Sequence, residues 1–123
     1  ARDSKYKLNY ITEIMASKEI YLARYYMQRE KWIPAIKRFK KVVKDYDTTI
    51  YVEEALHRLV ELNYKIGLVD EAENYASILG YNYGSGQWYE ASYKILNIDY
   101  ERKKISKKDE RETILKKFKN LFK

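Results

Sequence analysis

Residues 22–42, LARYYMQREKWIPAIKRFKKV, and residues 59–79, LVELNYKIGLVDEAENYASIL, repeat one order of large and small side chains. The small position in the middle of each copy is an alanine, Ala35 in the first and Ala72 in the second, 37 residues later. A small side chain at such a position allows the two helices of a hairpin to cross closely. The repeated order therefore predicts two consecutive helical hairpins.

The spacing follows the tetratricopeptide repeat (TPR), whose usual period is about 34 residues. A three-residue insertion near residues 48–51 accounts for the longer offset. We expect an all-α fold in which TPR-like antiparallel helix hairpins stack as a short solenoid, with a capping helix at the C-terminus. Ala23, Ala35 and Ala72 are expected to lie at the helix crossings.

The positions of glycine, proline and capping residues predict the helix boundaries. Expected helices cover residues 4–29, 33–46, 52–66, 70–79 and 87–96, and a last helix opens with a capping box at Ser106 and Asp109. Asp70 is expected to cap its helix, and residues 80–86 to form a glycine-containing loop. The first helix is expected to carry an apolar stripe made of Ile11, Ile14, Met15, Leu22, Tyr25 and Tyr26. The second is expected to bury Ala35, Ile36, Phe39, Val42 and Val43.

The composition agrees with amphipathic helices. The 123 residues include four Gly and one Pro, with 46% hydrophobic and 35% charged residues, which argues against a β-rich or disordered chain. The absence of Cys excludes a disulfide framework and a thiolate metal site. The chain does not begin with Met, so we treat it as a possible fragment of a longer protein.

The net charge of +7 is concentrated near the C-terminus. Residues 1–96 carry 15 basic and 13 acidic side chains, whereas residues 97–123 carry 10 and 5. We therefore predict a helical repeat segment over 1–96 and a basic helical tail over 97–123. Because the repeats are nearly neutral, a nucleic-acid-binding domain is the weakest binding hypothesis.

No residues suggest a catalytic, metal or cofactor site. The single histidine, His57, has no Cys or His partner, and we expect it at the surface or the edge of the core. The acidic pairs at 53–54 and 70–71 fall at predicted helix starts, where acidic residues are favoured anyway. The tyrosines at positions 25, 26, 64, 75 and 93 are expected to pack between helices.

Longer runs give a more specific match than the repeat spacing. AIKRF, VEEALHRL, GLVDEA and QWYEASYKIL, within residues 11–96, resemble the C-terminal half of the BamD (ComL/YfiO) family, in particular its alphaproteobacterial branch. These are TPR lipoproteins of the outer-membrane β-barrel assembly machinery. The family usually has Gly where this chain has Glu30, and its lipidated Cys and earlier repeats have no counterpart here.

The resemblance implies a non-enzymatic scaffold on the periplasmic face of the outer membrane, without a cofactor. Its implied partners are the membrane-proximal POTRA domain of BamA and other Bam lipoproteins, with membrane association through a lipid anchor. Arg38 matches a family arginine that pairs with an acidic residue of that domain. Lys37, Lys41, Arg29 and Trp32 are expected to complete the contact.

Two alternatives remain open at this stage. The repeats are also compatible with a generic TPR adaptor that binds a partner peptide in its concave groove. The basic tail is expected to cap the solenoid, but contact with anionic lipid headgroups or with an acidic partner is also compatible with its lysines. The apolar residues between 4 and 15 are expected to be exposed and to favour self-association.

Overall fold

The computed structural model describes residues 2–84 and 86–121, and between residues 98 and 106 it describes the backbone alone. The described residues form helices and contain no strand. The helices are α1 (Arg2–Gln28), α2 (Trp32–Asp45), α3 (Val52–Lys65), α4 (Val69–Tyr83) and α5 (Gln87–Leu121). The first three begin and end within two residues of their predicted bounds.

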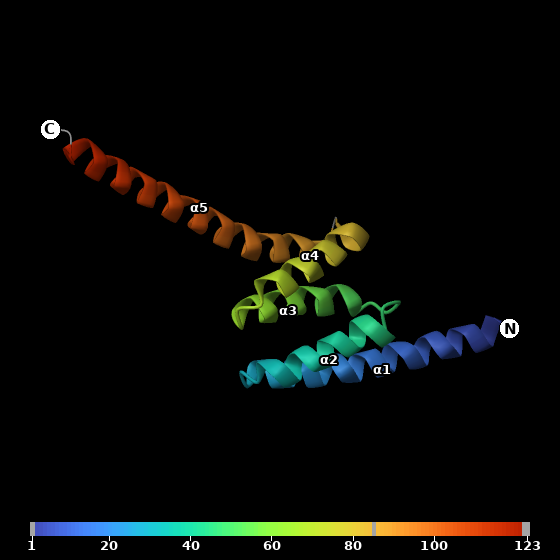
Figure 1. Ribbon diagram of the computed structural model, residues 1–123. Coiled ribbons are helices and arrows are strands. Elements are labelled where there is room, and N and C mark those ends of the chain that lie inside the picture. The colour runs from blue at the N-terminus through green and yellow to red at the C-terminus, as the bar shows by residue number, and fades with distance from the viewer. Residues whose placement is uncertain (1, 85, 122–123) are drawn as a thin grey trace. The chain divides into compact units, whose positions relative to one another are not determined.

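The first four helices pair into two hairpins, α1 with α2 and α3 with α4, and the hairpins stack through α2 and α3 (Figure 1). These hairpins and the first turns of α5 belong to one compact unit, Ala1–Ser92, while the remainder of α5 belongs to a second, Tyr93–Lys123. The predicted all-α stack of TPR-like hairpins is confirmed.

The turn between α1 and α2 closes through backbone hydrogen bonds. The Lys31 N–H donates to the Tyr26 carbonyl over 2.9 Å, and the Glu30 N–H donates to the Met27 carbonyl over 3.0 Å. This pair of bonds is the Schellman motif, which requires a left-handed residue after the helix end. Glu30 takes that conformation, with φ of 59°.

The turn between α3 and α4 has the same bonds at the equivalent positions. The Leu68 N–H donates to the Asn63 carbonyl over 2.8 Å, and the Gly67 N–H donates to the Tyr64 carbonyl over 3.1 Å. Gly67 is left-handed, with φ of 90°. The two turns therefore repeat the same backbone geometry, with glycine at the left-handed position in the second hairpin and glutamate in the first.

The main core lies between α1, α2 and α3. Ala23, Ala35 and Ala72 are fully buried, which confirms the crossing role predicted for them. The predicted buried face of α2 is also confirmed, with Val43 partly buried. The core cluster is made of Ile20, Ala23, Ala35, Ile36, Phe39, Val42, Ala55, Leu59 and Leu62.

A second cluster joins α3, α4 and the start of α5. Val52, Leu56 and Leu79 form its centre, and Trp88 and Tyr89 pack against it from α5. Gly80 allows this contact, because a Cβ atom there would lie 2.6 Å from the Tyr89 ring. The first turns of α5 are therefore part of the same folded unit as the hairpins.

The apolar stripe predicted on α1 is not its fully buried face. Ile11, Ile14 and Met15 are exposed, as expected for the apolar residues before position 16, and Leu22 and Tyr26 are half-buried. Tyr25, expected to pack between helices, is exposed, and the buried residues are Ala16, Ile20 and Ala23. At about 100° per residue, the predicted residues do share one stripe, but it lies opposite the alanines. The side of α1 that packs on α2 carries small side chains, because these allow the two helices to approach closely. The periodicity of the large apolar residues does not reveal which side this is.

Other local predictions also need correction. Asp70 is the second residue of α4 rather than its cap, α4 continues through Gly80 to Tyr83, and α5 runs through residue 106 without the predicted new start. Tyr93, like Tyr25, is exposed, whereas Tyr26, Tyr64 and Tyr75 are half-buried as expected. The side chain of Ser106, and all of Ser85 and Phe122, lie outside the described residues.

Candidate functional site

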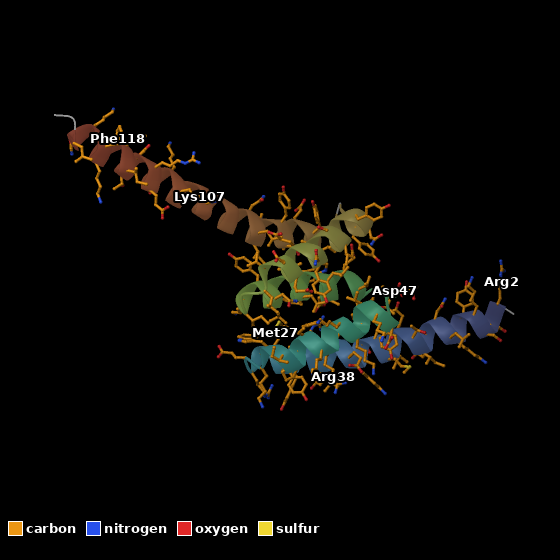
Figure 2. The ribbon with its side chains drawn as sticks, in the orientation of Figure 1. Arg2, Met27, Arg38, Asp47, Lys107 and Phe118 are labelled. Carbon is orange, nitrogen blue, oxygen red and sulfur yellow. The ribbon has the colours of Figure 1, made fainter. Side chains whose placement is uncertain are left out.

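The predicted partner-binding residues of α2 lie on the face opposite its buried side chains. Because Ile36 and Phe39 point into the core, Lys37, Arg38 and Lys41 are directed away from it. Figure 2 shows Arg38 on the side of the α1–α2 hairpin that faces away from α3. The amphipathic pattern of α2 thus places three cations on one outer surface.

One carboxylate on α1 orders two of these cations. Arg38 Nη1 lies 3.1 Å from Glu19 Oε2, and Lys41 Nζ lies 3.5 Å from Glu19 Oε1. The Glu19 side chain is only 12% exposed, whereas those of Arg38 and Lys41 are 38% and 46% exposed. With Lys37, three positive charges face one negative charge, so the surface keeps a net positive charge.

A groove of about 350 Å³ lies beside these cations. Tyr26 of α1 with Ile33 and Pro34 at the start of α2 supply its apolar wall. Lys37, Arg38 and Lys41 line the rest of it. An apolar groove with a basic rim suits a partner that presents an apolar side chain next to a carboxylate.

The other two predicted residues make their contacts elsewhere. The Arg29 guanidinium stacks 3.5 Å from the centre of the Tyr25 ring and donates from Nη1 to the Tyr25 carbonyl over 3.3 Å. Trp32 packs against the main core, with Lys65 Nζ 4.5 Å from its ring centre. The structure thus brings Lys37, Arg38 and Lys41 together and assigns Arg29 and Trp32 to local packing.

A second groove, of about 520 Å³, lies along another face of α1. The Glu54 carboxylate at the start of α3 is buried next to it and is bonded to both Nε and Nη2 of Arg24. This bond is the main cause of the raised pKa of Arg24. From the sequence, Glu54 was explained by the helix dipole alone, because its partner is 30 residues away. The groove is lined by Ser17, Lys18, Ile20, Tyr21, Leu22, Arg24 and Tyr51.

His57 is buried rather than at the surface, and it belongs to a polar cluster that the sequence did not reveal. Its Nδ1 lies 2.7 Å from Ser92 Oγ, its Nε2 lies 3.3 Å from Glu61 Oε2, and its ring lies 5.2 Å from that of Trp88. The hydrogen bond with His57 is the main cause of the lowered pKa of Glu61. Ser92 is fully buried, so the cluster acts in packing α5 onto α3.

Among the residues that the structure describes, none of the helices combines the length and the apolar character needed to cross a bilayer.

Comparison with known proteins agrees with the fold. The sequence model of the family YfiO, "Outer membrane lipoprotein", matches residues 1–78. The chain is 41% identical over 96 residues to the outer membrane protein assembly factor BamD of Rickettsia prowazekii. The aligned region covers 78% of this chain and 38% of that protein. It is 38% identical over 97 residues to the BamD of Caulobacter vibrioides, covering 79% of this chain and 32% of that protein.

The BamD of Neisseria gonorrhoeae is 38% identical over 65 residues, which cover 53% of this chain and 24% of that protein. The chain thus spans between about a quarter and two fifths of the length of these curated relatives. The resemblance found in the sequence is confirmed, including its alphaproteobacterial character. The chain therefore belongs to the YfiO family of outer membrane lipoproteins, located at the outer membrane on its periplasmic side.

Proposed function

We propose that this chain acts as a non-enzymatic scaffold in the assembly of outer membrane proteins, and that it binds the membrane-proximal POTRA domain of BamA. The relatives it matches over most of its length are named outer membrane protein assembly factors. The binding surface is the basic groove of α2, with Arg38 as its central contact.

The observation that carries this proposal is the way Glu19 holds Arg38. Among the described contacts, both hydrogen bonds of Arg38 to Glu19 leave from Nη1. The Nε and Nη2 edge of the guanidinium is the edge that can hold a second carboxylate through two parallel bonds. Glu19 thus fixes the side chain without using this edge, which reduces the entropy lost when a partner binds.

Two variants that break the same ion pair test the role of Arg38. Arg38→Gln removes both the internal pair and the proposed contact, whereas Glu19→Gln removes the internal pair and keeps the arginine. We expect Arg38→Gln to weaken binding to the purified BamA POTRA domain by about 2 kcal/mol, the effect of a central interface residue. Glu19→Gln should weaken binding by less than about 1 kcal/mol, because it keeps the arginine that makes the proposed contact and removes only a pair whose cationic partners are solvent-exposed.

Binding is measured by isothermal titration, with circular dichroism to verify the helical content of each variant. Lys40→Gln, which removes an exposed charge from the same helix, controls for the general effect of charge. Equal losses in the Arg38 and Glu19 variants would assign Arg38 a purely internal role. Unchanged binding in both would remove the α2 groove from the interface.

A second candidate function is an adaptor that binds a partner peptide in a groove of the solenoid. The larger groove on α1 favours it, because the Tyr21 side chain in its wall is exposed and Lys18 supplies positive charge. Photo-crosslinking in cells from position 21 and from position 37 separates the two functions. BamA adducts at position 37 support the first, and other adducts at position 21 with none to BamA at position 37 support the second.

A further inference from the structure

The C-terminal part of α5, residues 107–121, has an exposed apolar stripe. Ile114, Leu115, Phe118 and Leu121 are between 58% and 80% exposed, although they are large hydrophobic side chains. Figure 2 labels Lys107 and Phe118 on this segment. At about 100° per residue, the four side chains fall within an arc of about 120°. They therefore form one face of the helix rather than a scattered set.

Lysines lie on both sides of this stripe. Lys117 and Lys119 are each about 100° from its centre, and Lys116 is on the opposite face. Asp109, Glu110 and Glu112 precede the stripe, and between residues 113 and 121, where the stripe lies, the charged side chains are all lysines. Lysine can keep its methylene groups against an apolar surface while its ammonium group reaches outward.

We propose that residues 107–121 of α5 bind, parallel to the surface, to a membrane leaflet that contains anionic lipid. The apolar stripe would enter the boundary between headgroups and acyl chains, and the flanking lysines would contact lipid phosphates. The location of the family at the outer membrane supplies such a surface. The inference rests on that location and does not depend on BamA as a partner.

The arrangement of charges favours a lipid surface over an acidic protein. Lysines on both flanks of a narrow stripe match a surface with negative charge on both sides of the inserted residues, as a lipid leaflet has. An acidic protein groove is the competing occupant, and the experiments below separate the two. In either case the proposed surface is confined to the second compact unit, Tyr93–Lys123.

Vesicle sedimentation with the whole 123-residue chain tests the proposal. Vesicles of equal parts phosphatidylglycerol and phosphatidylethanolamine should bind the chain, and vesicles of phosphatidylcholine alone should bind it far more weakly. The triple variant Lys116→Gln, Lys117→Gln, Lys119→Gln should lose at least about twenty-five-fold in affinity for the anionic vesicles. This is about fivefold for each of the two flanking lysines, Lys117 and Lys119, equivalent to about 1 kcal/mol for a charge near an anionic surface.

A matched variant removes the same charge elsewhere. Lys7→Gln, Lys40→Gln, Lys44→Gln changes three exposed lysines of α1 and α2 and should keep most of the affinity. For the apolar stripe, Leu115→Ser with Leu121→Ser should abolish binding. Ile50→Ser with Tyr81→Ser, which changes two exposed apolar residues outside α5, should not. Far-UV circular dichroism in solution and with vesicles shows whether each variant is helical.

A fluorescent label shows which face meets the lipid. Because the chain has no native Cys, Phe118→Cys and Asn120→Cys each give one labelling site, on nearly opposite sides of the helix. With anionic vesicles, an environment-sensitive dye should shift to the blue at position 118 and not at position 120.

Three outcomes would overturn the proposal. One is the absence of binding to anionic vesicles. Another is an equal loss of affinity in the two lysine variants, which would mean attraction by net charge alone. The third is binding to polyglutamate without binding to vesicles, which would identify an acidic polypeptide as the occupant.

Discussion

At the scale of single residues, the two hairpin turns differ in one side chain. Both need a left-handed residue to close the Schellman bonds, and only the second turn has glycine there. A residue with a Cβ atom in this conformation costs about 1–2 kcal/mol. Glu30 therefore carries a backbone cost that Gly67 avoids.

We predict that Glu30→Gly stabilises the protein by about 0.5–1 kcal/mol. The relief of the left-handed strain exceeds the entropy that glycine adds to the unfolded chain. Urea denaturation followed by circular dichroism measures the difference in the free energy of unfolding. A loss of stability would mean that the Glu30 side chain makes a compensating contact.

The reverse substitution at the equivalent turn is the control. Gly67→Ala should destabilise the protein by about 1–2 kcal/mol through the backbone alone, because a Cβ atom there would have no neighbour within 4 Å. Changes of the same sign in the two variants would contradict the equivalence of the turns.

The candidate site shows how far reasoning from the sequence reaches at this scale. Lys37, Arg38 and Lys41 were predicted together because Arg38 matches an arginine of the family and the two lysines are its near neighbours in the sequence. Glu19, which orders two of them, was missed because it lies on the preceding helix. Its position follows only from how α1 packs on α2.

At the scale of helices, the polar cluster around His57 connects α3 to the first turns of α5. Ser92 Oγ lies 2.9 Å from the Trp88 carbonyl as well as 2.7 Å from His57 Nδ1. An ionised carboxylate can only accept, so the hydrogen in the contact between His57 and Glu61 is on Nε2. The cluster thus depends on the ionised form of Glu61.

We predict that acid weakens the fold partly through Glu61. Its pKa is lowered in the folded state, mainly by the hydrogen bond with His57 and further by the charge of Arg58. A lowered pKa stabilises the folded state above the ordinary glutamate value, near 4.3, and this stabilisation is lost as the pH falls through the folded-state value.

Urea midpoints at about pH 6 and about pH 3 measure this effect, on either side of the ordinary glutamate pKa. The decrease in urea midpoint from the higher to the lower pH should be smaller in Glu61→Gln than in the original chain. Glu73→Gln, at an exposed position of α4, should leave the drop unchanged. Identical drops in all three proteins would show that Glu61 does not contribute.

The contact between Gly80 and Tyr89 allows a test of α4 packing on α5. In an exposed helix, Gly→Ala stabilises by about 1 kcal/mol. We predict that Gly80→Ala instead destabilises this protein, because the new methyl group would lie 2.6 Å from the Tyr89 ring. In a Tyr89→Ala background the same substitution should stabilise it, as thermal unfolding of the four proteins would show. The same sign in both backgrounds would exclude the clash as the cause.

Helix boundaries were predictable where turn chemistry is local, and buried faces were not always so. Proline at position 34 is a local signal for the start of α2, and glycine at position 67 is one for the end of α3. Both bounds lie close to their predicted positions. The buried face of α1 depends on which side packs on α2, which is a tertiary choice. The helix start predicted at Ser106 was wrong because residues that favour a cap are also tolerated inside a long helix.

At the scale of the whole molecule, exposed apolar surface remains on the first folded unit. Along the N-terminal half of α1, exposed apolar side chains cover a broad arc that lies away from the buried Ala16 and Ala23. Among them are Leu8, Tyr10, Ile11, Ile14 and Met15. A contiguous apolar face of this kind is typical of a protein–protein contact.

We predict that the 123-residue chain self-associates through this face. Two copies can bury the stripe against each other in a symmetric contact, since the same face is available on both. Sedimentation velocity over a range of concentrations should show a rising average mass. Leu8→Lys with Ile11→Lys should keep the chain monomeric, because charge on both copies would oppose the contact.

Ile50→Lys with Tyr81→Lys adds the same charge at two other exposed apolar positions and serves as the control. If net charge alone kept the chains apart, both variants would become monomeric to the same degree. A difference between them assigns the association to α1, because only the first variant changes the stripe. A chain that is monomeric at every concentration before any substitution would contradict the prediction.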